Sequence, residues 1–347
     1  MSKRQLRWGL LSTARINQML IPHFRSVAGC ELLAVGSSSQ PKAEEYSRKW
    51  AIPRAYGSYD ALLADPDVDA VYISLPNIYH AEWAVRCAEA GKHILCEKPL
   101  ALTVEEVDRM AEAARRNRVV LQEAAMYRFH PQTPEVRELV RQGAIGDLRL
   151  IRGVFHISIP IEESDIRFSF DSQHGGGSLW DLGLYPVSFA RVMAGAEPVE
   201  VFGWQDQGGT QVDLTFAGLM RFPGGILAQI SSSFQILAQW EVELIGTKGI
   251  IHVDTPYLAQ RKTGSARVRI FRDDPSVEQM FGDSREHLQI ETLAYDRIDP
   301  YGYEVEGMAA TILDGHSPAI PLEESRANVA ALVALHRSAR ENRPVRP

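Results

Sequence analysis

The sequence has few cysteines and no long apolar stretch, and both absences narrow the class of protein. Cys30, Cys87 and Cys96 are odd in number, widely spaced and set in apolar or helical surroundings, which predicts reduced core thiols rather than disulfide bonds. No run approaches the roughly 20 apolar residues that cross a membrane. The basic N-terminus passes directly into a strand-like run without a small-residue cleavage site. We therefore expect no secretory signal and a cytoplasmic protein.

Patterns that bind metals or nucleic acids are also missing. The histidines show no H-E-x-x-H spacing and the cysteines no C-x-x-C, so no metal site is predicted. The formal net charge of -7 argues against a nucleic-acid partner, because phosphate binding requires a positive surface. Small-molecule chemistry is the expected class of function.

The length and the order of apolar patterns indicate two domains. At 347 residues the chain exceeds what one hydrophobic core usually supports. Strands alternate with helices at first, which predicts a doubly wound parallel sheet of the Rossmann type; later strand-like runs follow one another, which predicts an open, mainly antiparallel sheet. We expect an α/β protein with a dinucleotide-binding domain at 1–125 and a substrate-binding and oligomerisation domain at 126–347, whose last helix packs back on the first domain. The later strand-like runs are 148–157, 199–204, 210–221, 226–233, 240–246 and 250–253, with helices expected at 302–315 and 322–340.

Residues 7–16 are typical of a strand, a tight turn and the start of a helix. Aligned with G-x-G-x-x-G, the turn has Ser12, Ala14 and Asn17 at the glycine positions. Small residues at the first two positions would let backbone N–H groups reach a pyrophosphate. An ordinary small-residue turn fits the pattern equally well.

The second strand, residues 31–36, ends in Ser37, Ser38 and Ser39, and Lys42 follows. NAD-specific folds usually place Asp or Glu here for the ribose hydroxyls, whereas a 2′-phosphate requires hydroxyl donors and a cation. The serines and the lysine therefore favour NADP(H), with NAD(H) as the alternative. A solvated loop also fits, since Lys42 begins an acidic helix.

Two further strands end in residues that favour a ligand site. The near-continuous apolar run 69–75 is typical of a parallel strand buried on both faces, and Asn77 and His80 follow it. The run 91–100 places Glu97-Lys98-Pro99 directly behind a short apolar strand. A lysine at a buried strand end needs a partner or a purpose, and ligands bind at the carboxyl ends of such strands. A plain Glu-Lys ion pair is the alternative.

A third motif, Gly175-Gly176-Gly177, leads into a predicted helix that contains Asp181 and Tyr185. Residues four apart on a helix share one face, and consecutive glycines let the backbone approach another surface closely. Taken alone, a first-turn aspartate and a core tyrosine explain this segment better. Together with Lys98, the segment favours a site.

These motifs resemble the Gfo/Idh/MocA oxidoreductases, the family of glucose–fructose oxidoreductase and inositol dehydrogenase, over nearly the whole chain. The resemblance is carried by the turn at 9–16, Pro76-Asn77 with His80, Glu97-Lys98-Pro99 and the segment 175–185. Residues 127–132, Asp165-Ile166-Arg167 and Tyr185 look most like the branch of dimeric dihydrodiol dehydrogenase, NADP-dependent xylose dehydrogenase and sugar 3-ketoreductases.

Two positions depart from the family pattern. Family members usually have glycines where this chain has Ser12 and Ala14, a departure at the residues that would contact the pyrophosphate. Inositol dehydrogenase-like members usually have histidine where this chain has Tyr185, which argues against an imidazole relay.

The resemblance implies catalytic roles for Lys98, Tyr185 and Asp181. Tyr185 would take the hydroxyl proton; a free phenol has a pKa of about 10, so a cation, Lys98, would have to favour the phenolate. Asp181 would position Lys98 or a second hydroxyl. Substrate contacts would involve Arg167 and Tyr127. The implied cofactor contacts are Gly9, Ser12, Thr13, Ala14, Arg15, Ile16, Ser37, Ser38, Lys42, Leu75, Asn77, His80, Glu97, Lys98 and Arg128.

The predicted function is NADP-dependent hydride transfer to or from a sugar or vicinal diol. The alternatives are redox-assisted glycoside hydrolysis with a retained nicotinamide cofactor, and a non-catalytic nucleotide-sensing module. We expect a homodimer or homotetramer formed through the second sheet, because an exposed apolar sheet face requires cover, and no membrane partner.

Overall fold

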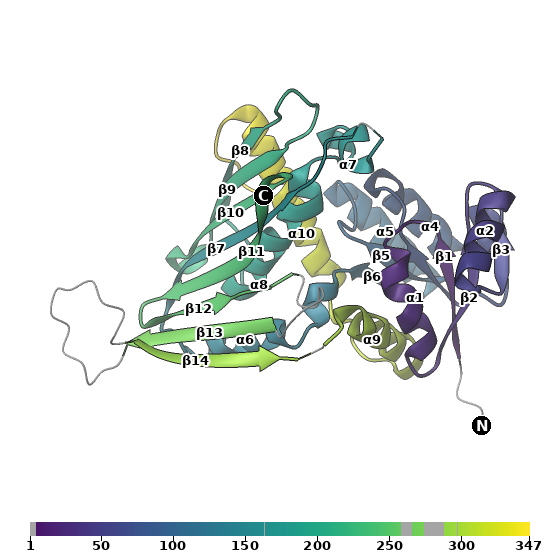
Figure 1. The fold of residues 1–347 in the computed structure, drawn as a ribbon, viewed down its shortest axis with the longest axis horizontal. Coiled ribbons are helices and arrows are strands. Elements are labelled where there is room, and N and C mark those ends of the chain that lie inside the picture. The colour runs from purple at the N-terminus through teal and green to yellow at the C-terminus, as the bar shows by residue number, and fades with distance from the viewer. Residues whose placement is uncertain (1–4, 163, 258–265, 274–287, 297) are drawn as a thin grey trace. The chain divides into compact units, whose positions relative to one another are not determined.

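The computed structural model describes residues 5–162, 164–257, 266–273, 288–296 and 298–347. The chain separates into two compact units (Figure 1). Unit 1 comprises Met1–Phe129 and Pro300–Val329, and unit 2 comprises His130–Asp299 and Ala330–Pro347.

Unit 1 is built on a six-stranded parallel sheet in the order β3-β2-β1-β4-β5-β6. The order reverses at β1, so right-handed crossovers place the first and the later helices on opposite faces; in Figure 1, α1 lies in front of the sheet and the paler α4 and α5 lie behind it. The predicted Rossmann fold is confirmed, although β3 and α3 were not predicted. The elements are β1 (Leu6–Leu11), α1 (Asn17–Ser26), β2 (Cys30–Gly36), α2 (Gln40–Trp50), β3 (Arg54–Tyr56), α3 (Tyr59–Leu63), β4 (Ala70–Ile73), the 3₁₀ helix η1 (Asn77–Tyr79), α4 (His80–Glu89), β5 (His93–Glu97), α5 (Val104–Asn117), β6 (Leu121–Ala124), the 3₁₀ helix η2 (Met126–Phe129), α9 (Pro300–Asp314) and the first part of α10 (Leu322–Glu341).

The core of unit 1 joins the N-terminal sheet to a helix from the end of the chain. The rings of Trp8 and Phe24 lie 4.7 Å apart between centroids, and both side chains are fully buried. Val305 and Met308 of α9 belong to the same buried cluster. Burying each such side chain contributes about 1.5–3 kcal/mol, so α9 is an integral part of unit 1.

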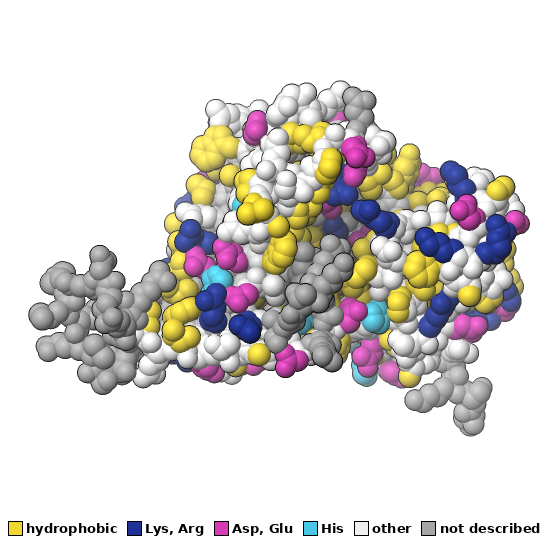
Figure 2. Space-filling view, viewed as in Figure 1, with side chains coloured by type: hydrophobic (Ala, Val, Ile, Leu, Met, Phe, Trp, Pro, Cys, Tyr) yellow, Lys and Arg dark blue, Asp and Glu magenta, His cyan; other side chains and the backbone are white. Residues whose placement is uncertain are grey.

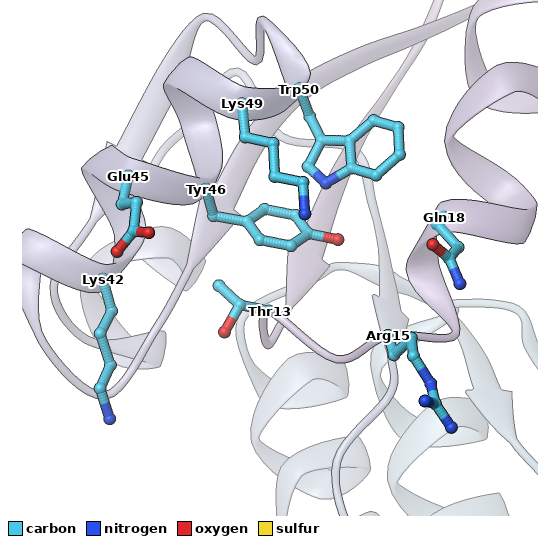
Figure 3. Close-up of a pocket in the computed structure, with 8 residues that line it drawn as sticks. All are labelled: Thr13, Arg15, Gln18, Lys42, Glu45, Tyr46, Lys49 and Trp50. Atoms are coloured by element: carbon cyan, nitrogen blue, oxygen red, sulfur yellow. The ribbon is translucent and has the colours of Figure 1, made fainter.

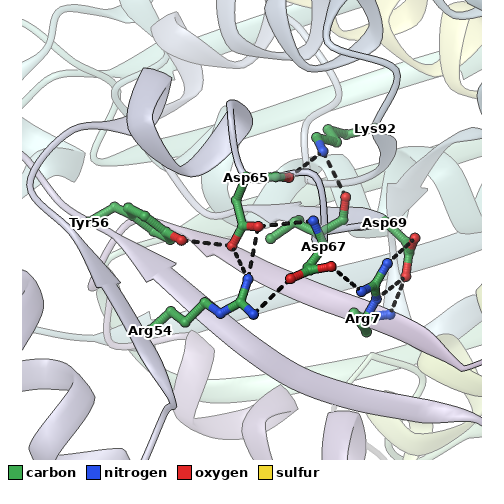
Figure 4. Close-up of polar contacts among 8 residues, drawn as sticks. Arg7, Arg54, Tyr56, Asp65, Asp67, Asp69 and Lys92 are labelled. Carbon is green, nitrogen blue, oxygen red and sulfur yellow. Dashed lines mark hydrogen bonds and ion pairs between the residues drawn. The ribbon is translucent and has the colours of Figure 1, made fainter.

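A charged network fixes the segment between α3 and β4 (Figure 4). Arg54 donates to both oxygens of Asp65, at 2.9 and 2.8 Å, and to Asp67. Arg7 on β1 donates to Asp67 and Asp69, and the Lys92 ammonium donates to the carbonyl of Asp65 at 2.7 Å. The network therefore ties the start of β4 to β1, β3 and β5.

Asp65 is the buried member of this network, and its replacement by asparagine should destabilise the protein. Burial raises the pKa of its carboxyl, but hydrogen bonds from Arg54 and Tyr56 outweigh burial and hold the pKa below its usual value. A carboxyl whose pKa is lower in the folded than in the unfolded state stabilises the protein at pH values above the unfolded pKa. This stability is lost as the pH falls through the folded pKa. We expect Asp65→Asn to lower the free energy of unfolding by about 1.5–3 kcal/mol at pH 7.

Urea unfolding at pH 7, 5 and 3 measures this difference. The gap between wild type and variant should narrow as the pH falls, because the stability contributed by the Asp65 carboxylate is lost as the pH passes through its lowered folded pKa. Asp67→Asn, whose side chain is 45% exposed, is the matched control with a smaller loss. An equal effect of the two variants would contradict the assignment to burial.

Unit 2 contains an eight-stranded sheet in the order β14-β13-β12-β11-β7-β10-β9-β8. Its neighbours are antiparallel except the pair β7 and β10, so the predicted, mainly antiparallel sheet is confirmed. The elements are α6 (Gln132–Arg141), β7 (Leu148–Ser158), α7 (Ile166–Ser169), the 3₁₀ helix η3 (Ser172–His174), the π-helical turn η4 (Leu179–Gly183), α8 (Leu184–Ala194), β8 (Glu200–Asp206), β9 (Thr215–Arg221), the 3₁₀ helix η5 (Pro223–Gly225), β10 (Leu227–Ser233), β11 (Gln235–Gly246), β12 (Gly249–Val253), β13 (Ala266–Asp273), β14 (Leu288–Tyr295) and the end of α10.

Two strand predictions in unit 2 need correction. Strands β13 and β14 were not predicted. The run 210–221 was predicted as one strand, but β9 begins only at Thr215. Residues 210–214 instead form a connection in which the hydroxyl of Thr210 donates to the carbonyl of Val212 and the Asp213 side chain turns into the interior. The apolar composition of the run hid this turn.

Helices cover one face of the unit 2 sheet. A side chain at Gly153 on β7 would bring its Cβ within 3.0 Å of Pro186, so this glycine lets α8 approach the sheet closely. Along β9 the buried side chains alternate with exposed ones, as expected when one face is packed and one is open. Figure 2 shows hydrophobic and charged side chains side by side over the strands of unit 2.

Candidate functional site

The turn between β1 and α1 has a serine in a conformation that favours glycine. Ser12 has φ of 136°, a region that costs a non-glycine residue of order 1–3 kcal/mol. Its hydroxyl lies 2.8 Å from that of Ser74 and donates to the Ser74 carbonyl. Ser74 in turn donates to Asn17, whose amide donates to the Ser12 carbonyl at 2.9 Å. Side-chain hydrogen bonds therefore hold the strained turn at two of the three expected glycine positions.

The other residues predicted in this turn occupy different environments. Gly9 lies inside β1, where an added Cβ would come within 3.0 Å of Leu62, so its structural role is packing against α3. The N–H of Ala14 donates to the Ser12 hydroxyl, and Ile16 is the N-cap residue of α1. Thr13 and Arg15 line a cavity.

This cavity, of about 320 Å³, lies between the turn and α2 (Figure 3). Figure 3 shows Tyr46 and Trp50 extending from α2 above Thr13, while Lys42 and Arg15 extend to either side. The structure thus brings together three residues predicted to bind the cofactor. The cavity is also lined by residues that were not predicted. Those from α2 lie on one face of the helix, and this spacing could have indicated them from the sequence. The added residues are Gln18, Glu45, Tyr46, Lys49 and Trp50.

The serines after β2 differ in accessibility. Ser37 is 3% exposed, and its N–H donates to the carbonyl of Tyr56. Ser38 is exposed. Ser38 is therefore the better placed of the two predicted hydroxyls to meet a ligand.

The turn that carries Lys98 is held from both neighbouring strands. The hydroxyl of Tyr72 on β4 donates to the Glu97 carboxylate, which also accepts from the N–H of Lys98 at 3.3 Å. Glu123 on β6 accepts from the N–H of Leu100 at 3.0 Å. Lys98, half-buried, therefore has a fixed backbone position at the carboxyl edge of the sheet. Tyr72 and Glu123 were not predicted, because their role depends on pairing between strands.

His80 joins the ends of β4 and β5. Its ring nitrogens lie 2.9 Å from the carbonyl oxygen of Pro99 and 2.8 Å from that of Leu75, and the ring is fully buried. Burial lowers the pKa of His80, and the charge of Lys98 lowers it further. Both nitrogens are used inside the protein, so His80 would act on a cofactor through the backbone. Asn77, half-buried, opens the short helix η1 that precedes it.

Two other predicted residues lie in the interior of unit 1. Arg128 pairs with Glu324 at the start of α10, at 2.7 Å, and its side chain is 9% exposed. Tyr127 is 1% exposed. A cofactor contact of Arg128 and a substrate contact of Tyr127 stay predictions.

In unit 2, the segment that carries Asp181 and Tyr185 is helical, but its first turn is a π-helix. Leu179–Gly183 forms this turn, and α8 continues from Leu184. The N–H of Leu184 donates to the carbonyl of Leu179, the i to i+5 pattern that is common near functional sites. The sequence predicted a helix here but not the wider turn.

Tyr185 lies in an aromatic cluster. Its ring centroid lies 5.3 Å from that of Phe155 on β7 and 5.5 Å from that of Tyr257, and the residue is 5% exposed. Phe155 and Tyr257 stack on each other at 5.3 Å. The phenol is thus held in one orientation by rigid neighbours.

Arg167 lies on α7, next to the glycine run. Its guanidinium donates to Asp165 at 3.0 Å, and the side chain is 23% exposed. Its carbonyl accepts from the N–H of Gly177 at 3.0 Å. The structure therefore places this predicted substrate residue beside the segment that leads to Asp181. Lys98 belongs to unit 1, whereas Asp181 and Tyr185 belong to unit 2.

Three structural features bear on other classes of function. Within the described ranges, no helix has the length and apolarity to cross a membrane. No group of three or more metal-binding side chains gathers in the part of the chain that the structure describes. Cys30, Cys87 and Cys96 are buried free thiols.

Comparison with known proteins places the chain in a family. Residues 6–125 match the oxidoreductase family with an NAD-binding Rossmann fold, and residues 133–252 match the GFO/IDH/MocA C-terminal domain. The chain belongs to the Gfo/Idh/MocA oxidoreductase family. The resemblance predicted from the motifs is therefore confirmed, and the protein is an oxidoreductase with a nicotinamide-dinucleotide-binding fold.

Relatives within this family include dehydrogenases of sugars and diols. The chain is 38% identical to an uncharacterized oxidoreductase of Rhizobium meliloti, over 96% of this chain and 97% of the relative. It is 32% identical to a D-xylose 1-dehydrogenase (NADP(+)) of Haloferax volcanii, with the same coverage. It is 35% identical to the trans-1,2-dihydrobenzene-1,2-diol dehydrogenase of Mus musculus, over 72% and 74% of the two chains.

A solved structure shows the same architecture. The 3-ketoreductase KijD10 of Actinomadura kijaniata, in complex with NADP and TDP-benzene, superposes with a TM-score of 0.85 at 26% identity. The match covers 96% of this chain and 98% of the other.

Proposed function

We propose that this protein is an NADP-dependent oxidoreductase that transfers a hydride between the cofactor and a carbinol or carbonyl of a sugar or vicinal diol. The observation that carries the proposal is the turn at 97–100, which fixes Lys98 at the carboxyl edge of a parallel sheet by hydrogen bonds from both adjacent strands. Ligands of such sheets bind at that edge.

The residues at the same edge fit a phosphorylated dinucleotide. The β1 turn leads into the N-terminal end of α1, whose dipole would favour the negative charge of a pyrophosphate. Lys42 and Arg15 at the cavity beside α2, together with the exposed Ser38, supply the cations and the hydroxyl that a 2′-phosphate requires. Bound NADP would supply the chemistry of hydride transfer at the nicotinamide.

The proton transfer would be performed by side chains of this chain. We assign Tyr185 to exchange the proton of the substrate hydroxyl, with Lys98 favouring the phenolate through its charge. The aromatic cluster around Tyr185 would keep the phenol oriented. Asp181, four residues earlier, would position Lys98 or a second substrate hydroxyl, and Arg167 would contact the substrate.

The relatives support the substrate class. The Haloferax relative is named as an NADP(+) xylose dehydrogenase and the mouse relative as a diol dehydrogenase, and both substrates are vicinal diols. A panel of aldoses, ketoses and cyclic diols with NADP and NAD, monitored by the absorbance of reduced nicotinamide, tests the proposal. Absence of turnover with every polyol would refute it, and a cofactor that is retained without net reduction would favour redox-assisted hydrolysis.

We further propose that the open face of the unit 2 sheet forms a homodimer or homotetramer. Trp204 on β8, Leu219 on β9 and Leu227 on β10 are 56%, 46% and 49% exposed on this sheet. Exposed apolar side chains on neighbouring strands mark association surfaces. The occupant that the chain itself offers is a second copy of the same face.

Sedimentation should therefore give a mass of two or four times 38.7 kDa at micromolar concentration. Leu219→Glu should shift the protein toward the monomer, because burying a carboxylate in an apolar interface is unfavourable. Gln5→Glu, which adds the same charge on unit 1, should leave the mass unchanged. A wild-type monomer would rule out this assembly.

A further inference from the structure

Asp213 is a fully buried carboxylate that grips the start of the π-helical turn. Its Oδ2 accepts hydrogen bonds from the Ser178 hydroxyl and the Leu179 N–H, both at 2.7 Å. Its main-chain carbonyl accepts from the N–H of Ser178 at 2.8 Å. The residue is 0% exposed. One residue from the connection between β8 and β9 thus makes three hydrogen bonds to two successive residues.

The glycine run is shaped around this carboxylate. Gly177 has φ of 101°, and a Cβ added to it would lie 2.1 Å from Oδ1 of Asp213. A Cβ added to Gly176 would lie 1.9 Å from the carbonyl oxygen of Phe170. Gly177 therefore leaves the room that the Asp213 carboxylate occupies, and Gly176 leaves room for the carbonyl of Phe170.

A chain of hydrogen bonds connects Asp213 to Leu184, the residue that precedes Tyr185. Leu179, which Asp213 holds through its N–H, accepts from the N–H of Leu184. The Ser178 hydroxyl also lies 3.0 Å from the hydroxyl of Ser232 on β10. A Cβ added to Gly183 would lie 2.9 Å from the same Ser232 hydroxyl oxygen. The π-helical turn is therefore anchored at its first residue and packed at its last.

A carboxylate is a costly choice for this position. Burial raises the pKa of Asp213 to about 6, against the hydrogen bonds from Ser178 and Leu179, which lower it. Its Oδ1 has no hydrogen-bond partner among the described residues. A serine or an exposed aspartate could cap a helix without this cost, so the buried carboxylate points to a role beyond capping.

We propose that Asp213 is a positioning residue, which sets the location of Asp181 and Tyr185 by holding the first residues of their helix. The effect on turnover rests on the function proposed above; the effect on the helix does not. As a carboxylate, Asp213 accepts strong charge-assisted hydrogen bonds and places negative charge at the helix N-terminus. Protonation weakens both, so the helix start loosens.

Other titratable groups lie on the elements around Asp213. These are Asp181 within the π-helical turn, Asp206 at the end of β8, and His156 on β7. The Nε2 atom of His156 lies 2.9 Å from the hydroxyl of Ser231. Burial lowers the pKa of His156. The Asp213 carboxyl accepts its hydrogen bonds from the Ser178 hydroxyl and the Leu179 N–H. Asp213 and Ser178 are therefore the side chains to substitute.

The test compares Asp213→Asn with Asp206→Asn, an exposed aspartate on the adjoining strand. Asp213→Asn should reduce kcat about tenfold or more above pH 7, because small displacements of reacting groups are costly, with little change in NADP affinity. The fall in activity of the wild type below pH about 6 should disappear in Asp213→Asn and persist in Asp206→Asn. An unchanged kcat and pH profile in Asp213→Asn would overturn the proposal.

Amide hydrogen exchange provides a readout that needs no substrate. Protection factors at residues 179–185, which correct for the pH dependence of the intrinsic exchange rate, should fall in Asp213→Asn at pH 8 and, in the wild type, on lowering the pH through about 6. If the protein shows no dehydrogenase activity but this exchange pattern holds, the proposed function fails and the grip of Asp213 stands. Unchanged exchange in Asp213→Asn would refute the grip itself.

Ser178→Ala covers the case in which Asp213→Asn does not fold. Loss of the hydroxyl removes a hydrogen bond that lowers the pKa of Asp213, so the pH at which exchange speeds up should rise. An unshifted midpoint would contradict the proposal. Global unfolding has the opposite pH dependence, because it moves Asp213 into water: its raised folded pKa contributes stability at low pH that is lost as the pH rises through about 6. Loosening of the helix start leaves the carboxyl buried and removes only the hydrogen bonds that lower its pKa, so protonation favours it. Asp213→Asn should remove both dependences.

Discussion

Replacement of Tyr185 by phenylalanine should reduce turnover by roughly a hundredfold or more, in line with the contribution of general acid–base catalysis. The ring would keep its contacts with Phe155 and Tyr257, so folding should be preserved and only the proton carrier lost. NADP affinity should be nearly unchanged, because Tyr185 and the predicted cofactor residues of the β1 turn belong to different units. Steady-state kinetics and cofactor titration measure both.

Lys98→Met should have a similar effect, because it removes the cation that favours the phenolate. The two residues serve one proton transfer, so the double variant should be little worse than either single variant. Effects that multiply would show that the lysine and the tyrosine act independently. If Tyr185→Phe kept near-normal turnover across the pH range, the tyrosine would be a packing residue of its aromatic cluster, and Lys98 alone would be the leading proton donor.

Substitution of Ser38 by aspartate should reverse the cofactor preference. The wild type should bind NADP about tenfold to a hundredfold more tightly than NAD, the contribution of a charge-assisted contact. A carboxylate at position 38 would repel the 2′-phosphate and accept hydrogen bonds from ribose hydroxyls. Ratios of kcat/KM for the two cofactors give the measurement.

Ser38→Asn is the matched control, since it has the size of aspartate without the charge. It should weaken NADP binding without improving NAD binding. Lys42→Gln should lower NADP affinity and leave NAD affinity unchanged, because only the phosphate requires the cation. Equal or better binding of NAD by the wild type would refute the preference.

The sequence determined much of the architecture, because the signals are local. Near-continuous apolar runs marked the buried parallel strands, as at Ala70–Ile73 and His93–Glu97, and the glycine run marked a close backbone approach. The alternation of strands and helices predicted a doubly wound parallel sheet. The motif at 97–99 indicated where a site would form.

Other features were decided only by the tertiary structure, because they depend on partners far away in the chain. Ser12 takes a glycine-like conformation through Ser74, 62 residues away. The role of Glu123 appears only when β6 pairs with β5. Likewise, α9 joins the core of unit 1 from the other end of the chain.

Asp213 shows most clearly what the sequence leaves open. Within the run 212–216 a single carboxylate among apolar residues reads as part of a strand, since periodicity carries no information on where a side chain finds its partners. Only the fold brings it to Ser178 and Leu179, 35 and 34 residues earlier. The sequence by itself determined which residue types were available for chemistry. The packing of the connection at 210–214 against the start of the helix at 179–194 decided which of them is held in place, because hydrogen bonds and burial are properties of spatial neighbours.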